Sequence, residues 1–323
     1  MNIMVTGGLG VNGSWVVREL VARGHEPVVV DTGDDTSLVA GLEGRYRLKR
    51  SDITDLTAMR DLIDRHEIGV VVHLAAYIAP DMDRHPHRAF EVNTNGTVTL
   101  LEAAAQGGVP RFVYASSRAV YGETPAGVGA PGYLPVGEDH PKTPRGAYGA
   151  TKLASDLMGQ VYRNTFGMEF AALRFAGIYG PGKQARHGKL ALRSRLVEEP
   201  FKGNPVVVPK GGDQVDDMIY VADVAEAIVM ATLAKRLDHG AYNIGAGEGV
   251  TLKQFAAAVR KVLPAARIEV GDGMNYLDTT LHNYAVFDIA RAERDFGWTP
   301  RFGLEAGIAD YVRILGERKE LTA

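Results

Sequence analysis

The sequence predicts an α/β fold, in which a doubly wound parallel sheet is joined to a smaller mixed α/β lobe. Short β-branched runs such as Val28-Val29-Val30 and Val70-Val71-Val72 are typical of strands buried on both faces of a sheet. Helical patterns separate these runs, which is the arrangement of βαβ units. The regular alternation ends near Gly177, and 323 residues exceed what one core usually holds, which predicts the lobe.

The predicted elements follow one another along the chain. Strands are expected near residues 3–6, 28–30, 70–72, 112–114 and 169–175, and helices near residues 15–23, 56–66, 89–106, 147–166, 221–234, 252–263 and 289–296. Gly24 should end the first helix, because glycine readily adopts the left-handed conformation that closes a helix. Residues 122–147 are rich in Gly and Pro and should form a long loop. We expect residues 1–175 with 220–245 to form the sheet domain, and residues 176–219 with 246–323 to form the lobe.

Composition and charge exclude several classes of function. Lys and Arg total 36 against 39 Asp and Glu, a formal net charge of −3, which gives no electrostatic reason to bind nucleic acid or an anionic membrane. The absence of cysteine excludes disulfides, thiolate metal sites and cysteine nucleophiles. His85 and His87 lack the spacing of metal ligands, so no metal is expected. No targeting or membrane-spanning pattern is seen, which makes a cytoplasmic protein the default expectation.

A glycine-rich turn joins the first predicted strand to the first predicted helix. The spacing of Gly7, Gly10 and Gly13 lets a pyrophosphate approach the helix N-terminus, where free N–H groups and the helix dipole favour negative charge. Asp31 ends the second strand, 18 residues beyond Gly13. A carboxylate there can accept hydrogen bonds from the adenosine ribose and repels a 2′-phosphate. No Arg or Lys stands at residues 32–34, so the sequence predicts a Rossmann-type site for NAD rather than NADP.

A tyrosine and a lysine form a second candidate site. Tyr148 and Lys152 are four residues apart, which places them on one face of the predicted helix. This pair alone is weak evidence of a catalytic site. Ser116 and Ser117 strengthen the interpretation, because they follow a buried-strand pattern at residues 112–115.

At these residues the sequence resembles the extended short-chain dehydrogenase/reductase family, in particular the NAD-dependent epimerase/dehydratase group with its UDP-glucose 4-epimerase-like members. The resemblance runs almost from end to end of the chain. The segments that carry it are residues 6–13, 31, 51–53, 73–76, 93–97, 116–122, 148–152, 173–175, 179–181, 220–225, 242–245 and 297–300.

The resemblance implies a role for each of these polar residues. Tyr148 would be the general base that takes the proton of a secondary alcohol, and Lys152 and the positive nicotinamide would lower its pKa from about 10. Ser117 would hold the reacting oxygen. Family members commonly pair as homodimers, here through the helices at 89–106 and 147–166. The implied NAD-binding residues are Gly7, Gly10, Val11, Gly13, Asp31, Asp52, Ile53, Leu74, Ala75, Ala76, Asn93, Tyr148 and Lys152.

The residues after Ser117 narrow the choice of reaction types. Family members that dehydrate a hexose carry an acidic pair there, whereas this sequence has Arg118 and Ala119, and an arginine cannot act as an acid or base near neutral pH. The resemblance therefore favours epimerisation of a sugar or sugar nucleotide through a transient ketone. An NAD-dependent dehydrogenase of a free sugar, sugar acid or polyol is the alternative. A non-catalytic NAD-binding regulator is disfavoured, because Ser117, Tyr148 and Lys152 are all present.

The substrate-binding part departs from the family pattern. UDP-sugar epimerases usually have Asn in place of Gly177, Arg in place of Asp216, and a further Arg within the segment that corresponds to residues 279–286, and none of these is present. A basic cluster at residues 183–195 either grips a carboxylate, phosphate or diphosphate, or forms a solvated helix face. The candidate contacts to a small carbohydrate substrate are Arg118, Tyr179, Lys183 and Arg186.

Overall fold

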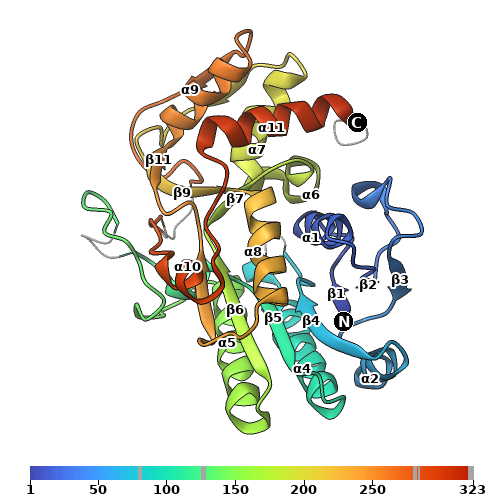
Figure 1. The fold of residues 1–323 in the computed structure, drawn as a ribbon. Helices are drawn as coiled ribbons and strands as arrows, with labels where there is room; N and C mark the ends of the chain where they lie inside the picture. The colour runs from blue at the N-terminus through green and yellow to red at the C-terminus, as the bar shows by residue number, and fades with distance from the viewer. Residues whose placement is uncertain (79–81, 125–128, 279–281, 283, 319–323) are drawn as a thin grey trace.

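The computed structural model describes residues 1–78, 82–124, 129–278, 282 and 284–318. Its centre is a parallel seven-stranded sheet in the order β10-β6-β5-β4-β1-β2-β3 (Figure 1). The strands are β1 (Asn2–Thr6), β2 (Val28–Asp31), β3 (Arg47–Arg50), β4 (Ile68–His73), β5 (Arg111–Ser117), β6 (Glu169–Phe175) and β10 (Ala241–Ile244). The order reverses direction between β1 and β4, and ligands of such sheets bind at the carboxyl ends beside this reversal. The predicted fold class is confirmed.

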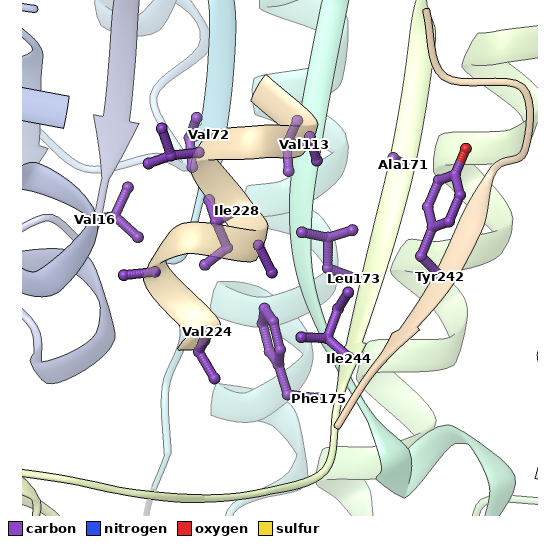
Figure 2. Close-up of a cluster of buried hydrophobic side chains, with 14 of the residues drawn as sticks. Val16, Val72, Val113, Ala171, Leu173, Phe175, Val224, Ile228, Tyr242 and Ile244 are labelled. Atoms are coloured by element: carbon purple, nitrogen blue, oxygen red, sulfur yellow. The ribbon is translucent and has the colours of Figure 1, made fainter. Parts of the chain in front are cut away.

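Helices cover both faces of the large sheet. One face carries α1 (Val11–Ala22) and α8 (Val221–Leu233), and the other carries α2 (Leu56–Arg65), α4 (Gly96–Gln106) and α5 (Ala147–Phe166). Figure 2 shows Val224 and Ile228 of α8 packed toward Val72, Val113 and Leu173 of the strands. Because both faces are covered, the inner strands such as β2 and β4 have no solvated side, which explains the unbroken apolar runs in the sequence.

The first elements agree closely with the predicted ones. Val28, Val29 and Val30 are at most 2% exposed, as expected for a strand buried on both faces. Gly24 has φ of +85° and donates to the carbonyl of Val21, which closes α1 as predicted. The predicted helix at 89–106 begins instead with a π-helical turn, Phe90–Asn95, before α4.

A smaller lobe follows β6 and lies at the top of Figure 1. Its three-stranded sheet has β9 (Val215–Tyr220) between β11 (Gly249–Thr251), antiparallel to it, and β7 (Gly177–Tyr179), parallel to it. The strands β8 (Val206–Val208) and β12 (Ile268–Val270) form a separate pair. The helices of the lobe are α6 (Lys183–His187), α7 (Leu192–Phe201), α9 (Leu252–Val262) and α11 (Leu304–Glu317).

The C-terminal part of the chain packs on both cores. The helix α10 (Ala290–Phe296) lies against β10, and the indole N–H of Trp298 donates to the carbonyl of Asp223 at 3.2 Å. Residues 285–298 thus contribute side chains to the core of the large sheet, although they follow β11 and α9 of the lobe. The division into two domains at the expected boundaries stays a prediction. The remaining short helices are η1 (Ser37–Val39), η2 (Met82–Arg84), α3 (Pro86–Ala89), η4 (Arg118–Tyr121) and η5 (Gly188–Ala191).

The described residues include no helix with both the length and the apolar character that crossing a membrane requires.

His73 at the end of β4 is a structural residue held between two threonines. The Thr97 hydroxyl donates to the carbonyl of Asn93 at 2.6 Å, so its oxygen accepts from His73 Nε2 at 3.0 Å. His73 Nδ1 then accepts from the Thr6 hydroxyl at 2.6 Å. Both ring nitrogens are satisfied in the neutral form, and burial together with the Lys152 charge lowers the pKa of His73 to about 3.

His73 is therefore expected to make the protein acid-labile. His73 is protonated below about pH 6.5 in the unfolded chain but only below about pH 3 in the folded chain. The free energy of unfolding therefore falls as the pH falls through this window. Between pH 7 and pH 4.5 the loss amounts to about 2–3 kcal/mol, from about 1.4 kcal/mol per pH unit. Denaturant unfolding across this range should show a shallower pH slope for His73→Gln. The exposed His87→Gln is the control, and equal slopes in all three proteins would contradict the assignment.

Candidate active site

The turn between β1 and α1 is tightly packed and leaves no space for side chains. Gly7 has φ of +69°, and a Cβ added to it would lie 2.6 Å from the amide nitrogen of Ala75. A Cβ on Gly13 would lie 2.1 Å from the carbonyl oxygen of Gly7. Glycine is therefore required at both positions, and the backbone is open to a ligand that approaches the start of α1.

The first turn of α1 faces a cavity of about 330 Å³. Gly10 is the N-cap of the helix, and the N–H groups of its first turn have no acceptor within the helix. Val11 and Gly13 line the cavity from this turn. The geometry fits a pyrophosphate, because backbone donors and the positive end of the helix dipole meet at one place.

A second cavity, of about 420 Å³, opens beside β2 and fits adenosine. Asp31 lines it, and its carboxylate accepts from the amides of Leu9 and Gly33, both at 3.0 Å. Asp52, Ile53 and Ala75 are further lining residues. The two cavities share the lining residues Gly7, Gly10, Leu74 and Ala76. The residues predicted to bind the two halves of a dinucleotide thus line one continuous groove.

Asp31 should select NAD over NADP. A 2′-phosphate would lie against the Asp31 carboxylate, and like charges brought together weaken binding. Calorimetry is expected to give an affinity for NAD at least about tenfold above that for NADP. Asp31→Asn should narrow this ratio, because it removes the charge and keeps one acceptor oxygen. The matched control is Asp61→Asn on the surface of α2, and a wild-type preference for NADP would contradict the role of Asp31.

Two of the predicted binding residues lie elsewhere. Arg186 does not reach the 330 Å³ cavity, because it pairs with Asp35 at the rim of the adenosine cavity. Asn93 lines neither cavity. Its side chain accepts a hydrogen bond from the Tyr77 amide at 2.7 Å and donates to the Tyr77 carbonyl at 3.0 Å and to the Thr151 hydroxyl. Tyr77 itself lines the adenosine cavity, so Asn93 positions this wall of the groove from behind.

Ser117, Tyr148 and Lys152 meet in the 330 Å³ cavity. Ser117 is the last residue of β5, and Tyr148 and Lys152 come from the first two turns of α5, which begins after the N-cap Gly146. Lys152 Nζ donates to the carbonyl of Ala115 at 2.7 Å, which directs it along β5 toward the cavity. The structure therefore brings the three predicted catalytic residues together.

The electrostatics differ in one respect from the expectation. Burial raises the pKa of Tyr148, while a hydrogen bond with Ser117 acts in the opposite direction. Burial is the largest effect on the pKa of Tyr148, and the Lys152 ammonium lies 5.8 Å from the Tyr148 ring centre. Burial lowers the pKa of Lys152 itself to about 8, against the opposing effect of Asp156. The protein groups alone thus leave Tyr148 protonated at neutral pH.

Asp216 does not present a free negative charge to the substrate. It is fully buried, and its two oxygens pair with Arg118 and Arg193, while Tyr276 donates to it at 2.6 Å. Burial alone would raise the pKa of Asp216, but the two guanidinium charges outweigh it and hold the pKa below its usual range. Arg118 is therefore neither a solvated loop arginine nor a free ligand, since it lines the cavity while paired with Asp216.

Tyr179, a predicted substrate contact, does not line either cavity. It is 1% exposed and packs in the core of the lobe, with its ring 5.2 Å from Phe255 and 5.4 Å from Tyr220. Its neighbour Ile178 lines the cavity instead, because side chains alternate along a strand. Lys183, another predicted substrate contact, lines the 330 Å³ cavity.

Several residues that line the cavities carry no recognisable signal in the sequence. Arg193 lay within the basic cluster but had no signal that distinguished it from its neighbours, and Leu277 comes from a segment without a motif. Arg88 reaches the adenosine cavity from α3. The segment that lacks the third arginine, residues 279–286, falls partly outside the described residues.

Among the described residues, no carboxylate lines the 330 Å³ cavity. Its polar side chains are one tyrosine, two serines, one asparagine, one histidine and four lysines or arginines, namely Tyr148, Ser116, Ser117, Asn12, His187, Arg118, Lys152, Lys183 and Arg193. Such a set can remove and return the proton of a hydroxyl group, with a phenol as the acid–base group and a serine to orient the oxygen. Among the described residues, the cavity lacks the acidic pair that the family resemblance associates with dehydration.

Comparisons with known proteins agree with this site. The family described as "NAD dependent epimerase/dehydratase family" matches residues 3–245. A UDP-glucose 4-epimerase of Lacticaseibacillus casei is 30% identical over 293 residues, which is 81% of each chain. A dTDP-glucose 4,6-dehydratase of Streptomyces griseus is 31% identical over 320 residues, which is 95% of this chain and 92% of that one. The crystal structure of Thermus thermophilus UDP-glucose 4-epimerase in complex with NAD superposes with a TM-score of 0.78 and 30% identity, covering 97% of this chain and 98% of the other. The chain belongs to the NAD-dependent epimerase/dehydratase family, and it is an enzyme with NAD as its cofactor.

Proposed function

We propose that the protein epimerises a sugar nucleotide at a secondary hydroxyl, through a transient ketone and with NAD returned to its oxidised form in every turnover. The observation that carries this proposal is the content of the 330 Å³ cavity. It holds Ser117, Tyr148 and Lys152 but, among the described residues, no aspartate or glutamate. Dehydration of a hexose needs a further acid–base pair, whereas epimerisation needs only one group that takes a proton and gives it back.

In this proposal Tyr148 takes the proton of the substrate hydroxyl while the hydrogen on the same carbon leaves as hydride. NAD, when bound, supplies the acceptor and later the donor of that hydride. Ser117 holds the reacting oxygen, and Lys152, fixed by the Ala115 carbonyl, supplies a positive charge close to the developing phenolate. If the ketone rotates in the cavity so that the hydride returns to its opposite face, the configuration of that carbon is inverted. Tyr148 then returns the proton to the oxygen.

The second candidate is a net NAD-dependent dehydrogenase of a free sugar, sugar acid or polyol. Asp216 favours it, because this residue stands where UDP-sugar epimerases usually have an arginine for the diphosphate. The experiment is to incubate the purified protein with NAD and a panel of UDP-sugars and free sugars. The proposal expects the epimer to form without accumulation of reduced nicotinamide. Stoichiometric formation of NADH together with an oxidised product would replace it by the dehydrogenase.

We also propose that two copies pair through α5 and the helix before it, in the cytoplasm where NAD is available. Leu157 and Val161 lie one turn apart on α5 and are 57% and 49% exposed, so they do not cover the sheet. Phe90, before α4, is 53% exposed. Apolar side chains exposed together are typical of a surface that another molecule covers.

A charge on this surface should separate the copies. Light scattering is expected to give a dimer for the wild type and a monomer for Leu157→Glu combined with Val161→Glu, since the introduced carboxylates would be buried without partners. Val207→Glu is the matched control, because Val207 is 55% exposed on β8 of the lobe. A monomeric wild type, or a double variant that remains dimeric, would contradict the pairing.

A further inference from the structure

We infer that the 330 Å³ cavity contains an oxyanion subsite, formed by Lys183 together with Arg118 and Arg193, that binds a carboxylate carried by the sugar of the substrate. The inference rests on the proposed function, because it assigns the substrate class of the same cavity. It distinguishes a sugar acid, free or linked to a nucleotide, from the neutral hexoses.

Lys183 is a buried cation without a counter-ion. It is 5% exposed, it lines the cavity from the start of α6, and it has no hydrogen-bond acceptor or carboxylate partner within the part of the chain that the structure describes. An unpaired ammonium in such a place is costly, since a buried charge normally has a partner. Burial, reinforced by the charge of Arg193, lowers the pKa of Lys183 to about 7. An anion in the cavity would supply the missing partner.

The arginines beside Lys183 leave a surplus of positive charge. Arg118 and Arg193 share a single carboxylate, that of Asp216. The Nε of Arg193 is buried and has no hydrogen-bond partner among the described residues. Two guanidinium groups and an ammonium thus face one carboxylate, and that carboxylate lies behind the arginines rather than in the cavity. The cavity is electrostatically suited to one further oxyanion.

The position of the arginines places this anion on the sugar. Arg118 directly follows Ser117, the residue that would hold the reacting oxygen, and both line the same cavity. In a hexuronate the carboxylate stands on the carbon next to the C4 hydroxyl, within reach of a neighbouring group. A diphosphate linkage is bonded to C1, across the ring from that hydroxyl. Charge beside Ser117 therefore favours a carboxylate on the ring over the diphosphate.

The test compares three probes on the NAD-loaded protein: UDP-glucuronic acid, UDP-glucose and free glucuronic acid. For the wild type, kcat/KM or affinity is expected to be at least about tenfold higher for UDP-glucuronic acid or free glucuronic acid than for UDP-glucose, because the carboxylate would form a charge-assisted pair. Lys183→Met should lower kcat/KM for the acid by about 10- to 100-fold and change that for UDP-glucose by less than about threefold. Lys183→Arg should recover part of the loss. The exposed Lys235→Met is the matched control and should leave both values unchanged.

Lys183→Met is expected to fold, because removing an unpaired buried charge does not destabilise a protein, and thermal unfolding verifies this. A preference of the wild type for UDP-glucose would overturn the inference. An equal loss for both UDP-sugars in Lys183→Met would do the same, since it would place Lys183 at the shared diphosphate.

The same experiment separates failure of the inference from failure of the proposed function. Formation of NADH from free glucuronic acid would show that the protein is a dehydrogenase rather than an epimerase, and it would still support the carboxylate subsite. If no probe turns over, calorimetry decides. Binding of UDP-glucuronic acid that is lost in Lys183→Met supports the subsite, and equal affinities for UDP-glucuronic acid and UDP-glucose in both proteins overturn it.

Discussion

Tyr148→Phe is expected to lower turnover by about 100- to 10,000-fold, the usual contribution of a general acid–base group. The variant keeps the ring and loses only the hydroxyl, so the cavity retains its shape. NAD affinity should change little, because the groove is formed mainly by the glycine turn and β2. The measurement combines steady-state kinetics on the substrate found by the screen with calorimetry of NAD binding.

Tyr46→Phe provides the control for this prediction. Tyr46 is partly buried at the edge of the sheet, and its ring packs on the core away from both cavities. Its loss of a hydroxyl should leave turnover unchanged. Substantial activity in Tyr148→Phe would mean that another group moves the proton, and the assignment of Tyr148 would then be wrong.

Gly13→Ala is expected to disrupt the dinucleotide groove. The added methyl group would lie 2.1 Å from the carbonyl oxygen of Gly7 and 2.7 Å from Cα of Gly8, so the backbone of the turn has to move. Forced overpacking of this kind costs about 1–3 kcal/mol of folding stability. NAD binding should weaken by about 10- to 100-fold, since each 1.4 kcal/mol corresponds to a tenfold change in affinity.

The control for Gly13→Ala is Gly316→Ala in α11, where an added Cβ meets no atom within 4 Å. This variant should be as stable as the wild type or slightly more so, because alanine favours a helix over glycine. Calorimetric NAD titration and thermal unfolding measure both effects. Unchanged NAD affinity in Gly13→Ala would show that the turn does not bind the pyrophosphate.

Features that are local in the sequence were predictable. The spacing of Gly7, Gly10 and Gly13 fixes a turn within a few residues, and the four-residue spacing of Tyr148 and Lys152 fixes a shared helix face. The strand at residues 28–30 was visible because its whole side-chain pattern is apolar. These signals depend only on the spacing of residues and on the pattern of apolar side chains, and both can be read from a single sequence.

Contacts between distant segments were not predictable. Asp216 and Arg118 are 98 residues apart, and Arg186 and Asp35 are 151 apart, so no local pattern indicates either pair. A single sequence shows Asp216 as a reversed charge in the substrate slot. Only the fold shows that two arginines neutralise it and that the cavity remains cationic.

The lobe was predicted in outline, and of its helices only α9 was predicted, near residues 252–263. The strands β7 and β8 have three residues each, which is too short for a period to emerge, and α7 contains Pro200, which weakens a helical pattern. The helix α11 was not predicted, although Ile308, Tyr311 and Leu315 recur at helical spacing and are buried. That signal is present in the sequence. The π-helical turn before α4 has no comparable signal.

The most direct measurement follows one hydrogen atom. The substrate is labelled with deuterium on the carbon that bears the reacting hydroxyl and is incubated with the enzyme and NAD. The epimer is expected to carry the deuterium on the same, inverted carbon, because the hydride leaves and returns within one active site. Deuterium lost to water, or released with free reduced nicotinamide, would contradict it.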